Sequence, residues 1–200
     1  MLAANADVRQ HILEVAKPIM LGKGFAAVGL NEILQAAGVP KGSFYHYFES
    51  KDAFGEALLD AYFAGYLEQV DAVLTAGGGS AAERLMRYWA RWRETQASDD
   101  PQCKCLAVKL GAEVSDQSEA MRAALLRGTD RLVDRLTRAV AEAIADGSVD
   151  STIAPYATAV TLYQLWLGAS LLAKITRTGQ PFDAAIAATR RILSLPDQPA

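Results

Sequence analysis

The sequence predicts an all-α protein. Apolar residues recur every three or four positions along most of the chain, which is the period of a helix with one buried face. No stretch alternates between apolar and polar residues over several positions, so strands are not expected. Breaks that contain glycine or proline divide the helical pattern into about nine segments. With 51% hydrophobic and 22% charged residues, the composition is that of a globular protein rather than a disordered or fibrous one.

Local signals predict where these helices begin and end. Gly38 suits a left-handed helix C-cap, and Pro40 suits a helix start, where its missing N–H would have had no partner. Ser50 can cap the long helix that follows, and the glycine run at 77–79 ends that helix. The expected helices cover residues 7–21, 31–37, 41–48, 51–74, 81–96, 103–114, 118–145, 153–176 and 182–195.

The last two predicted helices indicate how the chain assembles. The helix over residues 153–176 is apolar nearly all the way round, so it must be covered on more than one side. The last helix adds another apolar face, and together they favour a homodimer that forms through a four-helix bundle. A charge at Leu167 or Leu171 is expected to break that bundle. The alternative is a helix wholly buried inside a monomer.

Charge and composition exclude several classes of protein. The formal net charge of −3 excludes a chain coated in positive charge, but not one that binds DNA through a small face. The only cysteines, Cys103 and Cys105, and the two histidines fit neither a disulfide scaffold nor a zinc pattern, so no metal or cofactor is expected. Charged residues at the N-terminus interrupt any secretory signal, and the apolar stretch at 162–173 is too short to span a membrane. We therefore expect a cytoplasmic protein with no membrane partner.

Residues 31–48 form a helix-turn-helix candidate, because two short predicted helices are joined by a glycine-containing turn. The run from Gly38 to Phe48, followed by Ser50-Lys51-Asp52, resembles the DNA-binding signature of the TetR family of transcriptional repressors. The resemblance implies a helix-turn-helix DNA-binding domain at residues 1–50 and a helical regulatory and dimerisation domain at residues 51–200. It also implies palindromic operator DNA as the partner of the homodimer.

The second helix of this motif carries the candidates for DNA contact. Its polar side chains suit a major groove, while Phe44 and Phe48 lie four residues apart and point inward. The lysines and the tyrosine hydroxyls are expected to hold phosphates, and the serine and the glycine backbone to lie near base edges. The alternative is that the two tyrosines are only half-buried aromatic residues. The candidates are Lys41, Gly42, Ser43, Tyr45, His46, Tyr47 and Lys51.

A closer resemblance, to members of the family that sense electrophiles or reactive chlorine, covers nearly the whole chain. It is carried by residues 105–110, 112–114, 118–122, 165–169 and 173–175. It implies that the repressor leaves its operator when an electrophile or oxidant modifies Cys105, with Lys174 tuning the thiol. A helix N-terminus and the nearby Lys104 and Lys109 are expected to favour the reactive thiolate. The alternative is that Cys105 is a small buried apolar residue and Lys174 a solvated charge. Cys103 is expected to have a structural or auxiliary role.

Two other functions compete with covalent sensing. Three aromatic residues either line a pocket for a flat apolar ligand or belong to the core: Trp89, Tyr163 and Trp166. If they line a pocket, the alternative function is a TetR-type repressor that is induced by reversible binding of a small molecule. A cysteine-dependent enzyme lacks a partner for its thiol, because His46 lies in the DNA-binding signature and no Cys-x-x-Cys motif occurs. We therefore do not expect an enzyme.

Overall fold

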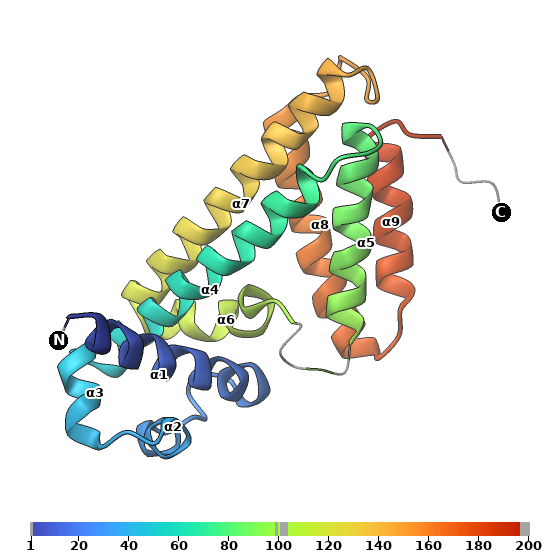
Figure 1. The fold of residues 1–200 in the computed structure, drawn as a ribbon. Coiled ribbons are helices and arrows are strands. Elements are labelled where there is room, and N and C mark those ends of the chain that lie inside the picture. The colour runs from blue at the N-terminus through green and yellow to red at the C-terminus, as the bar shows by residue number, and fades with distance from the viewer. Residues whose placement is uncertain (1, 99, 101–103, 197–200) are drawn as a thin grey trace. The chain divides into compact units, whose positions relative to one another are not determined.

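Nine α-helices and no strands make up the part of the chain that the structure, a computed structural model, describes: residues 2–98, 100 and 104–196, with side chains from residue 7 onward (Figure 1). The predicted all-α class is confirmed. None of these helices combines the length and the apolar character that a membrane span needs. The helices are α1 (Leu2–Lys23), α2 (Leu30–Ala37), α3 (Lys41–Tyr47), α4 (Lys51–Leu74), α5 (Ala81–Ala97), α6 (Leu106–Gln117), α7 (Glu119–Ala145), α8 (Pro155–Thr176) and α9 (Gln180–Ile192).

The predicted helix ends are correct at the positions that a local signal marks. Gly38 takes a left-handed φ of 66° and ends α2. The Ser50 hydroxyl accepts a hydrogen bond of 3.0 Å from the N–H of Ala53 in the first turn of α4. Helices α8 and α9 begin at Pro155 and Gln180 rather than at positions 153 and 182, because the first turn of a helix accommodates proline without losing a hydrogen bond.

Contacts within the chain define two compact units. The first consists of Met1–Gly65 and Asp99–Gly128, and the second of Tyr66–Ser98 and Thr129–Ala200. Helices α4 and α7 each continue from the first unit into the second. The predicted division after residue 50 separates functions rather than packing units, and it stays a prediction.

Aromatic packing fixes α3 within the first unit. The ring centroids of Phe44 and Phe48 lie 5.1 Å apart. Both rings also contact Phe54 of α4, at centroid distances of 5.5 Å and 5.1 Å. Phe44 and Phe54 are fully buried, and Phe48 is nearly so. The inward direction predicted for Phe44 and Phe48 is therefore confirmed, and the opposite side of α3 faces outward.

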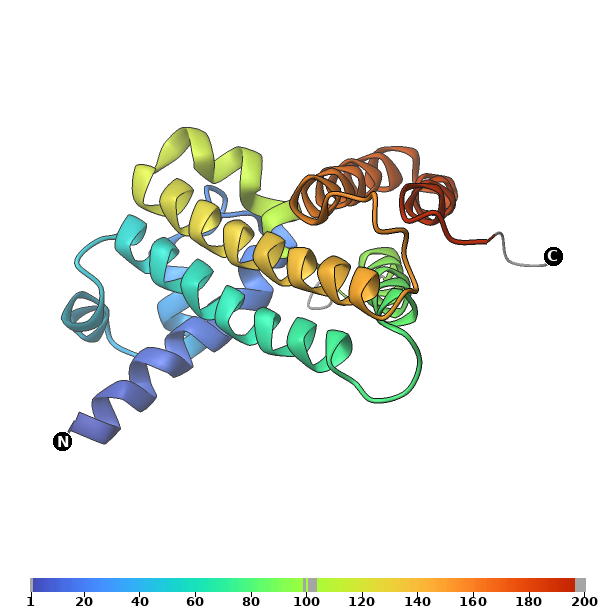
Figure 2. The same cartoon turned by 90° about the horizontal axis from the view of Figure 1, so that it is seen from above.

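In the second unit, α8 and α9 lie side by side and run in opposite directions, with α5 next to them (Figures 1 and 2). Trp89 of α5 stacks on Trp166 of α8, with ring centroids 4.9 Å apart and an interplanar angle of 12°. The Trp166 Nε1–H donates to Thr189 Oγ1 of α9 at 3.0 Å, and the Trp92 Nε1–H donates to Ser170 Oγ of α8 at 2.9 Å. Buried aromatic residues thus join the three helices.

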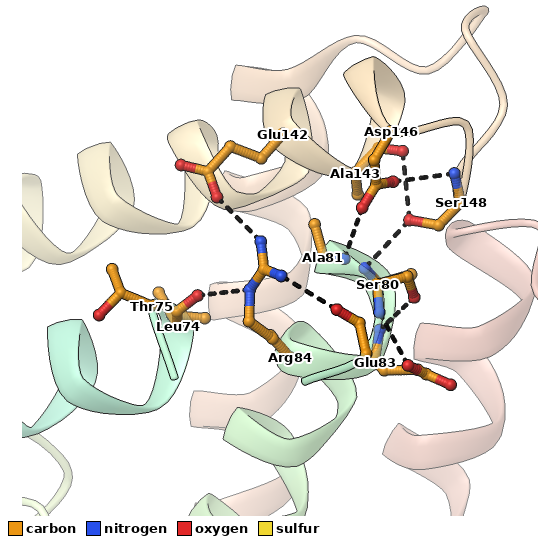
Figure 3. Close-up of polar contacts among 12 residues, drawn as sticks. Leu74, Thr75, Ser80, Ala81, Glu83, Arg84, Glu142, Ala143, Asp146 and Ser148 are labelled. Carbon is orange, nitrogen blue, oxygen red and sulfur yellow. Dashed lines mark hydrogen bonds and ion pairs between the residues drawn. The ribbon is translucent and has the colours of Figure 1, made fainter. Parts of the chain in front are cut away.

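The start of α5 is capped from two directions (Figure 3). Ser80 and Glu83 form a capping box, and the next two backbone N–H groups donate to the Asp146 carboxylate and the Ser148 hydroxyl at 2.7 Å and 3.2 Å. Arg84 donates to the last carbonyl of α4 at 2.7 Å. These bonds tie the ends of α4 and α7 to α5 inside the second unit.

Candidate functional site

The outward side of α3 presents the polar side chains that the sequence predicts for DNA contact. Tyr45 is 54% exposed, so it is not a half-buried aromatic residue, whereas Tyr47 is partly buried against its surroundings. Two short helices that meet at the left-handed Gly38, with the second held by a buried phenylalanine, form the predicted helix-turn-helix. The exposed candidates are Lys41, Gly42, Tyr45 and His46, and the half-buried ones are Ser43, Tyr47 and Lys51.

Lys51 also has a contact inside the first unit. Its ammonium donates to the carbonyl of Phe25 at 3.0 Å and lies 4.7 Å from the centroid of the Phe25 ring. A lysine ammonium carries three N–H donors, so this group can hold the segment between α1 and α2 and also reach a phosphate. A substitution of Lys51 would therefore change both contacts.

Cys105 is the N-cap residue of α6, and its side chain is buried. Burial raises the pKa of the thiol above its ordinary value, although hydrogen bonds from the Tyr62 hydroxyl and from the backbone N–H groups of residues 108 and 107 act in the opposite direction. The expectation that the thiolate is favoured is therefore wrong, because desolvation outweighs the helix N-terminus. Neither Lys104 nor Lys109 is among the groups that shift this pKa, and the Lys109 ammonium donates to the carbonyl of Gly22 at 3.3 Å.

The raised pKa predicts how Cys105 reacts with a maleimide. The thiolate is the nucleophile, so the rate of adduct formation in the folded Cys103→Ser protein is expected to rise about tenfold per pH unit between about pH 6.5 and about pH 8.5. Tyr62→Phe removes a hydrogen bond that lowers the pKa, so this variant should react more slowly at each pH. Intact mass spectrometry of timed samples measures the rate. A rate that levels off below about pH 8 would contradict a raised pKa.

The structure adds Glu113 of α6, which the sequence does not single out. Its carboxylate accepts hydrogen bonds from two consecutive backbone N–H groups between α1 and α2, that of Ala26 at 2.6 Å and that of Phe25 at 3.3 Å. These bonds join positions 87 and 88 residues apart, so no local pattern points to them. Glu113 lies in one of the stretches that carry the family resemblance, which is the only signal that marks its surroundings.

Comparison with known protein families adds independent support for this geometry. The family model "Bacterial regulatory proteins, tetR family" matches residues 12–58, which include the whole helix-turn-helix. The model "Tetracyclin repressor-like, C-terminal domain" matches residues 81–189. The chain belongs to the TetR family.

Individual TetR-family repressors resemble the chain over nearly its full length. It is 38% identical over 190 residues to the HTH-type transcriptional repressor NemR of Escherichia coli K12, and the matched region covers 95% of this chain and 96% of NemR. It is 33% identical over 180 residues to the repressor DhaR of Mycobacterium sp. strain GP1, and this match covers 90% of this chain and 89% of DhaR. The crystal structure of reduced E. coli NemR matches with a TM-score of 0.88 at 38% identity, over 96% of this chain and 100% of that one.

These relatives fix the general function of this TetR-family chain. They are transcriptional regulators and not enzymes, and the chain is a transcriptional repressor closely related to NemR. Repressors of the TetR family bind operator DNA and act as dimers.

Helix α8 carries several large apolar side chains that are exposed in the single chain, together with the exposed Thr161 and Gln164. Four side chains on α8 that the single chain leaves largely exposed are Tyr156 (64%), Leu171 (53%), Leu172 (53%) and Ile175 (66%). Leu167, one turn before Leu171, is half-buried. The alternative of a helix wholly buried within one subunit is therefore wrong, since this face remains open in the monomer.

The other predicted sensor residues have different surroundings. Lys174 is exposed in the last turn of α8 and belongs to the second unit, whereas Cys105 belongs to the first. Cys103 lies outside the described residues. The part played by Lys174 beside Cys105 stays a prediction.

The aromatic candidates lie in the core of the second unit. Trp89 and Trp166 are fully buried and stacked, and Tyr163 is buried. Trp89 Nε1 has no hydrogen-bond partner among the described residues. A groove of about 1130 Å³ lies elsewhere in this unit, along α5 and α9, with Met86, Arg93, Ile186 and Arg190 in its wall. In the described part of the chain, no three His, Cys, Asp or Glu side chains are grouped as metal ligands would be.

Proposed function

We propose that this repressor leaves its operator when an electrophile or oxidant modifies Cys105. The observation that carries the proposal is the position of this thiol, which is buried at the N-cap of α6 and is hydrogen-bonded by Tyr62 and by the first turn of the helix. Protein interiors are close-packed, so an adduct larger than a thiol cannot be held there without displacing the start of α6.

The chemistry at the sulfur needs only the inducer and water. With a maleimide or quinone, a bond forms between Cys105 Sγ and one carbon of the activated double bond, whose π bond is lost. The thiol proton ends on the neighbouring carbon of a maleimide or on an oxygen of a quinone. With hypochlorous acid, the thiolate takes the chlorine and releases hydroxide, and water then replaces chloride to give a sulfenic acid. A sulfenic acid can next condense with an amine or another thiol, with loss of water.

The DNA side of the proposal rests on the outward face of α3. One short helix per subunit offers few contacts, so a dimer has to place two of them on one operator. The expected operator is a palindrome whose half-sites lie about 34 to 36 Å apart, or a multiple of that distance. The open apolar face of α8, together with α9, is the surface that we assign to this dimer.

A second candidate is induction by reversible binding of a small apolar ligand in the second unit. It is favoured by the buried Trp89 Nε1, a donor that a ligand oxygen or nitrogen could satisfy. Against it stands the close stacking of Trp89 on Trp166, which fills the space that such a ligand would need.

Titration with N-ethylmaleimide distinguishes the two candidates. Each sample is divided between intact mass spectrometry, which counts adducts per subunit, and fluorescence anisotropy of a labelled operator. The proposal predicts that release follows the first adduct, that peptide mapping places it on Cys105, and that dialysis does not restore binding. Release without an adduct, reversed by dialysis, would instead establish the reversible mechanism.

A further inference from the structure

The segment between α1 and α2 is held by a carboxylate from α6. This linker, residues 24–29, contributes the backbone N–H groups of Phe25 and Ala26, which donate to Oε2 and Oε1 of Glu113 at 3.3 Å and 2.6 Å. Hydrogen bonds to an ionised acceptor are stronger than those between neutral groups. Two adjacent donors on one carboxylate also fix its orientation, so the linker has one preferred position against α6.

Two further contacts show how closely α6 approaches this linker. Gly24 has a φ of +92°, a backbone conformation that favours glycine, and a Cβ built there would lie 2.9 Å from Glu113 Oε2, so a side chain at this position would have to displace the carboxylate. One turn before Glu113, Lys109 donates to the carbonyl of Gly22 at 3.3 Å. Helix α6 therefore holds both the last turn of α1 and the linker that follows it.

The linker in turn contacts the elements that position α3. Phe25 is buried, and a Cβ on Gly55 of α4 would lie 2.8 Å from its ring, so Phe25 packs directly against α4. Lys51, the first residue of α4, holds the Phe25 carbonyl at 3.0 Å. Phe54 of the same turn packs on Phe44 of α3. A shift of the linker is thus passed to α3 through buried contacts.

Cys105, Lys109 and Glu113 follow one another at intervals of four residues. Side chains spaced in this way lie on one face of a helix, and eight residues correspond to about 12 Å along its axis. All three belong to the first compact unit. The thiol at the start of α6 and the two groups that hold the α1–α2 junction are therefore parts of one short rigid element.

We propose that Glu113 is a positioning residue that couples the state of α6 to the DNA-binding helices. In the unmodified protein, its carboxylate holds the linker so that α2 and α3 are placed for the operator. Displacement of α6 pulls this carboxylate away from the two N–H groups, and the population of the DNA-binding conformation falls. The entry of the signal at Cys105 rests on the proposed function, whereas the coupling of α6 to the linker rests on the contacts above.

Glu113→Gln tests the coupling, because it keeps the size of the side chain but removes the charge and one acceptor. Without any electrophile, we expect the operator Kd of this variant to rise about tenfold, which corresponds to about 1.4 kcal/mol. N-ethylmaleimide should then weaken binding by much less than it does in the parent. Hydrogen exchange of the peptide that contains Phe25 and Ala26 should be as fast in the unmodified variant as in the modified parent.

The matched control is Asp116→Asn, which makes the same carboxylate-to-amide change at an exposed position of α6. It should keep the operator affinity, the response to maleimide and the exchange of the linker. Lys109→Met should act in the direction of Glu113→Gln with a smaller effect, and it supplies the test should Glu113→Gln fail to give a folded dimer.

Two results would overturn the coupling. One is a Glu113→Gln protein that binds and is released like the parent. The other is a variant with weaker binding but the full fold-change on modification, since a purely structural role of Glu113 predicts that pattern. If maleimide does not release the parent protein from the operator, the sensing function is contradicted instead. The coupling is still tested in that case, because the operator affinity and the hydrogen exchange of unmodified Glu113→Gln are measured without any electrophile.

Discussion

Leu171→Asp is expected to convert the dimer into a monomer that binds the operator about a hundredfold more weakly. Leu171 is 53% exposed on α8, beside the equally exposed Leu172, in the apolar face that we assign to the subunit interface. Burial of an unpaired carboxylate in such an interface costs several kcal/mol, which is enough to separate most dimers at micromolar concentration. Loss of affinity follows because a monomer brings only one α3 to the DNA. Light scattering gives the mass, and operator anisotropy gives the affinity.

Leu126→Asp is the control for this substitution. Leu126 lies on α7 and is 50% exposed, so the change in side chain and the degree of exposure are closely matched. We expect this variant to remain a dimer and to bind the operator like the parent. A Leu171→Asp protein with the mass of a dimer would place the interface on another surface.

Lys41→Ala combined with Tyr45→Ala is expected to lower operator affinity about a hundredfold while the dimer stays intact. Both side chains are exposed on α3, and each contact is lost twice in a dimer. We assign Lys41 to a phosphate contact, so the slope of log K for the operator against log salt should be smaller in magnitude by about 1.8 when both subunits carry the substitution. Lys51 is left unchanged in this experiment, because its ammonium also holds the Phe25 carbonyl.

Arg138→Ala provides the comparison for charge. Arg138 is exposed on α7, so its loss removes one positive charge per subunit away from α3. It should change neither the affinity nor the salt slope beyond the error of the measurement. Equal losses in the two proteins would mean that overall charge, and not the face of α3, governs DNA binding.

Local chemistry explains why the DNA-binding helices could be predicted from the sequence. The left-handed conformation at Gly38 and the cap at Ser50 depend on residues a few positions away. The spacing of Phe44 and Phe48 alone determines that both point to one side of α3. The sequence therefore predicted the ends of these helices and the buried face of α3, because neither depends on distant parts of the chain.

The properties of α6 depend on contacts that are distant in sequence. The pKa of Cys105 is raised by burial, and burial depends on how α6 packs rather than on the lysines nearby in the sequence. The bonds of Glu113 join residues 87 and 88 positions away. Periodicity also does not distinguish a buried aromatic residue from one that lines a pocket, so only the stacking of Trp89 on Trp166 identifies these two residues as part of the core.

Covalent induction through Cys105 is tested most directly by release of a labelled operator from three proteins: the parent, Cys105→Ser and Cys103→Ser. All three should bind the operator with similar affinity before treatment. After N-ethylmaleimide or hypochlorite, the parent and Cys103→Ser should release the DNA, whereas Cys105→Ser should retain it. Release of Cys105→Ser as readily as the parent would contradict covalent sensing at this thiol.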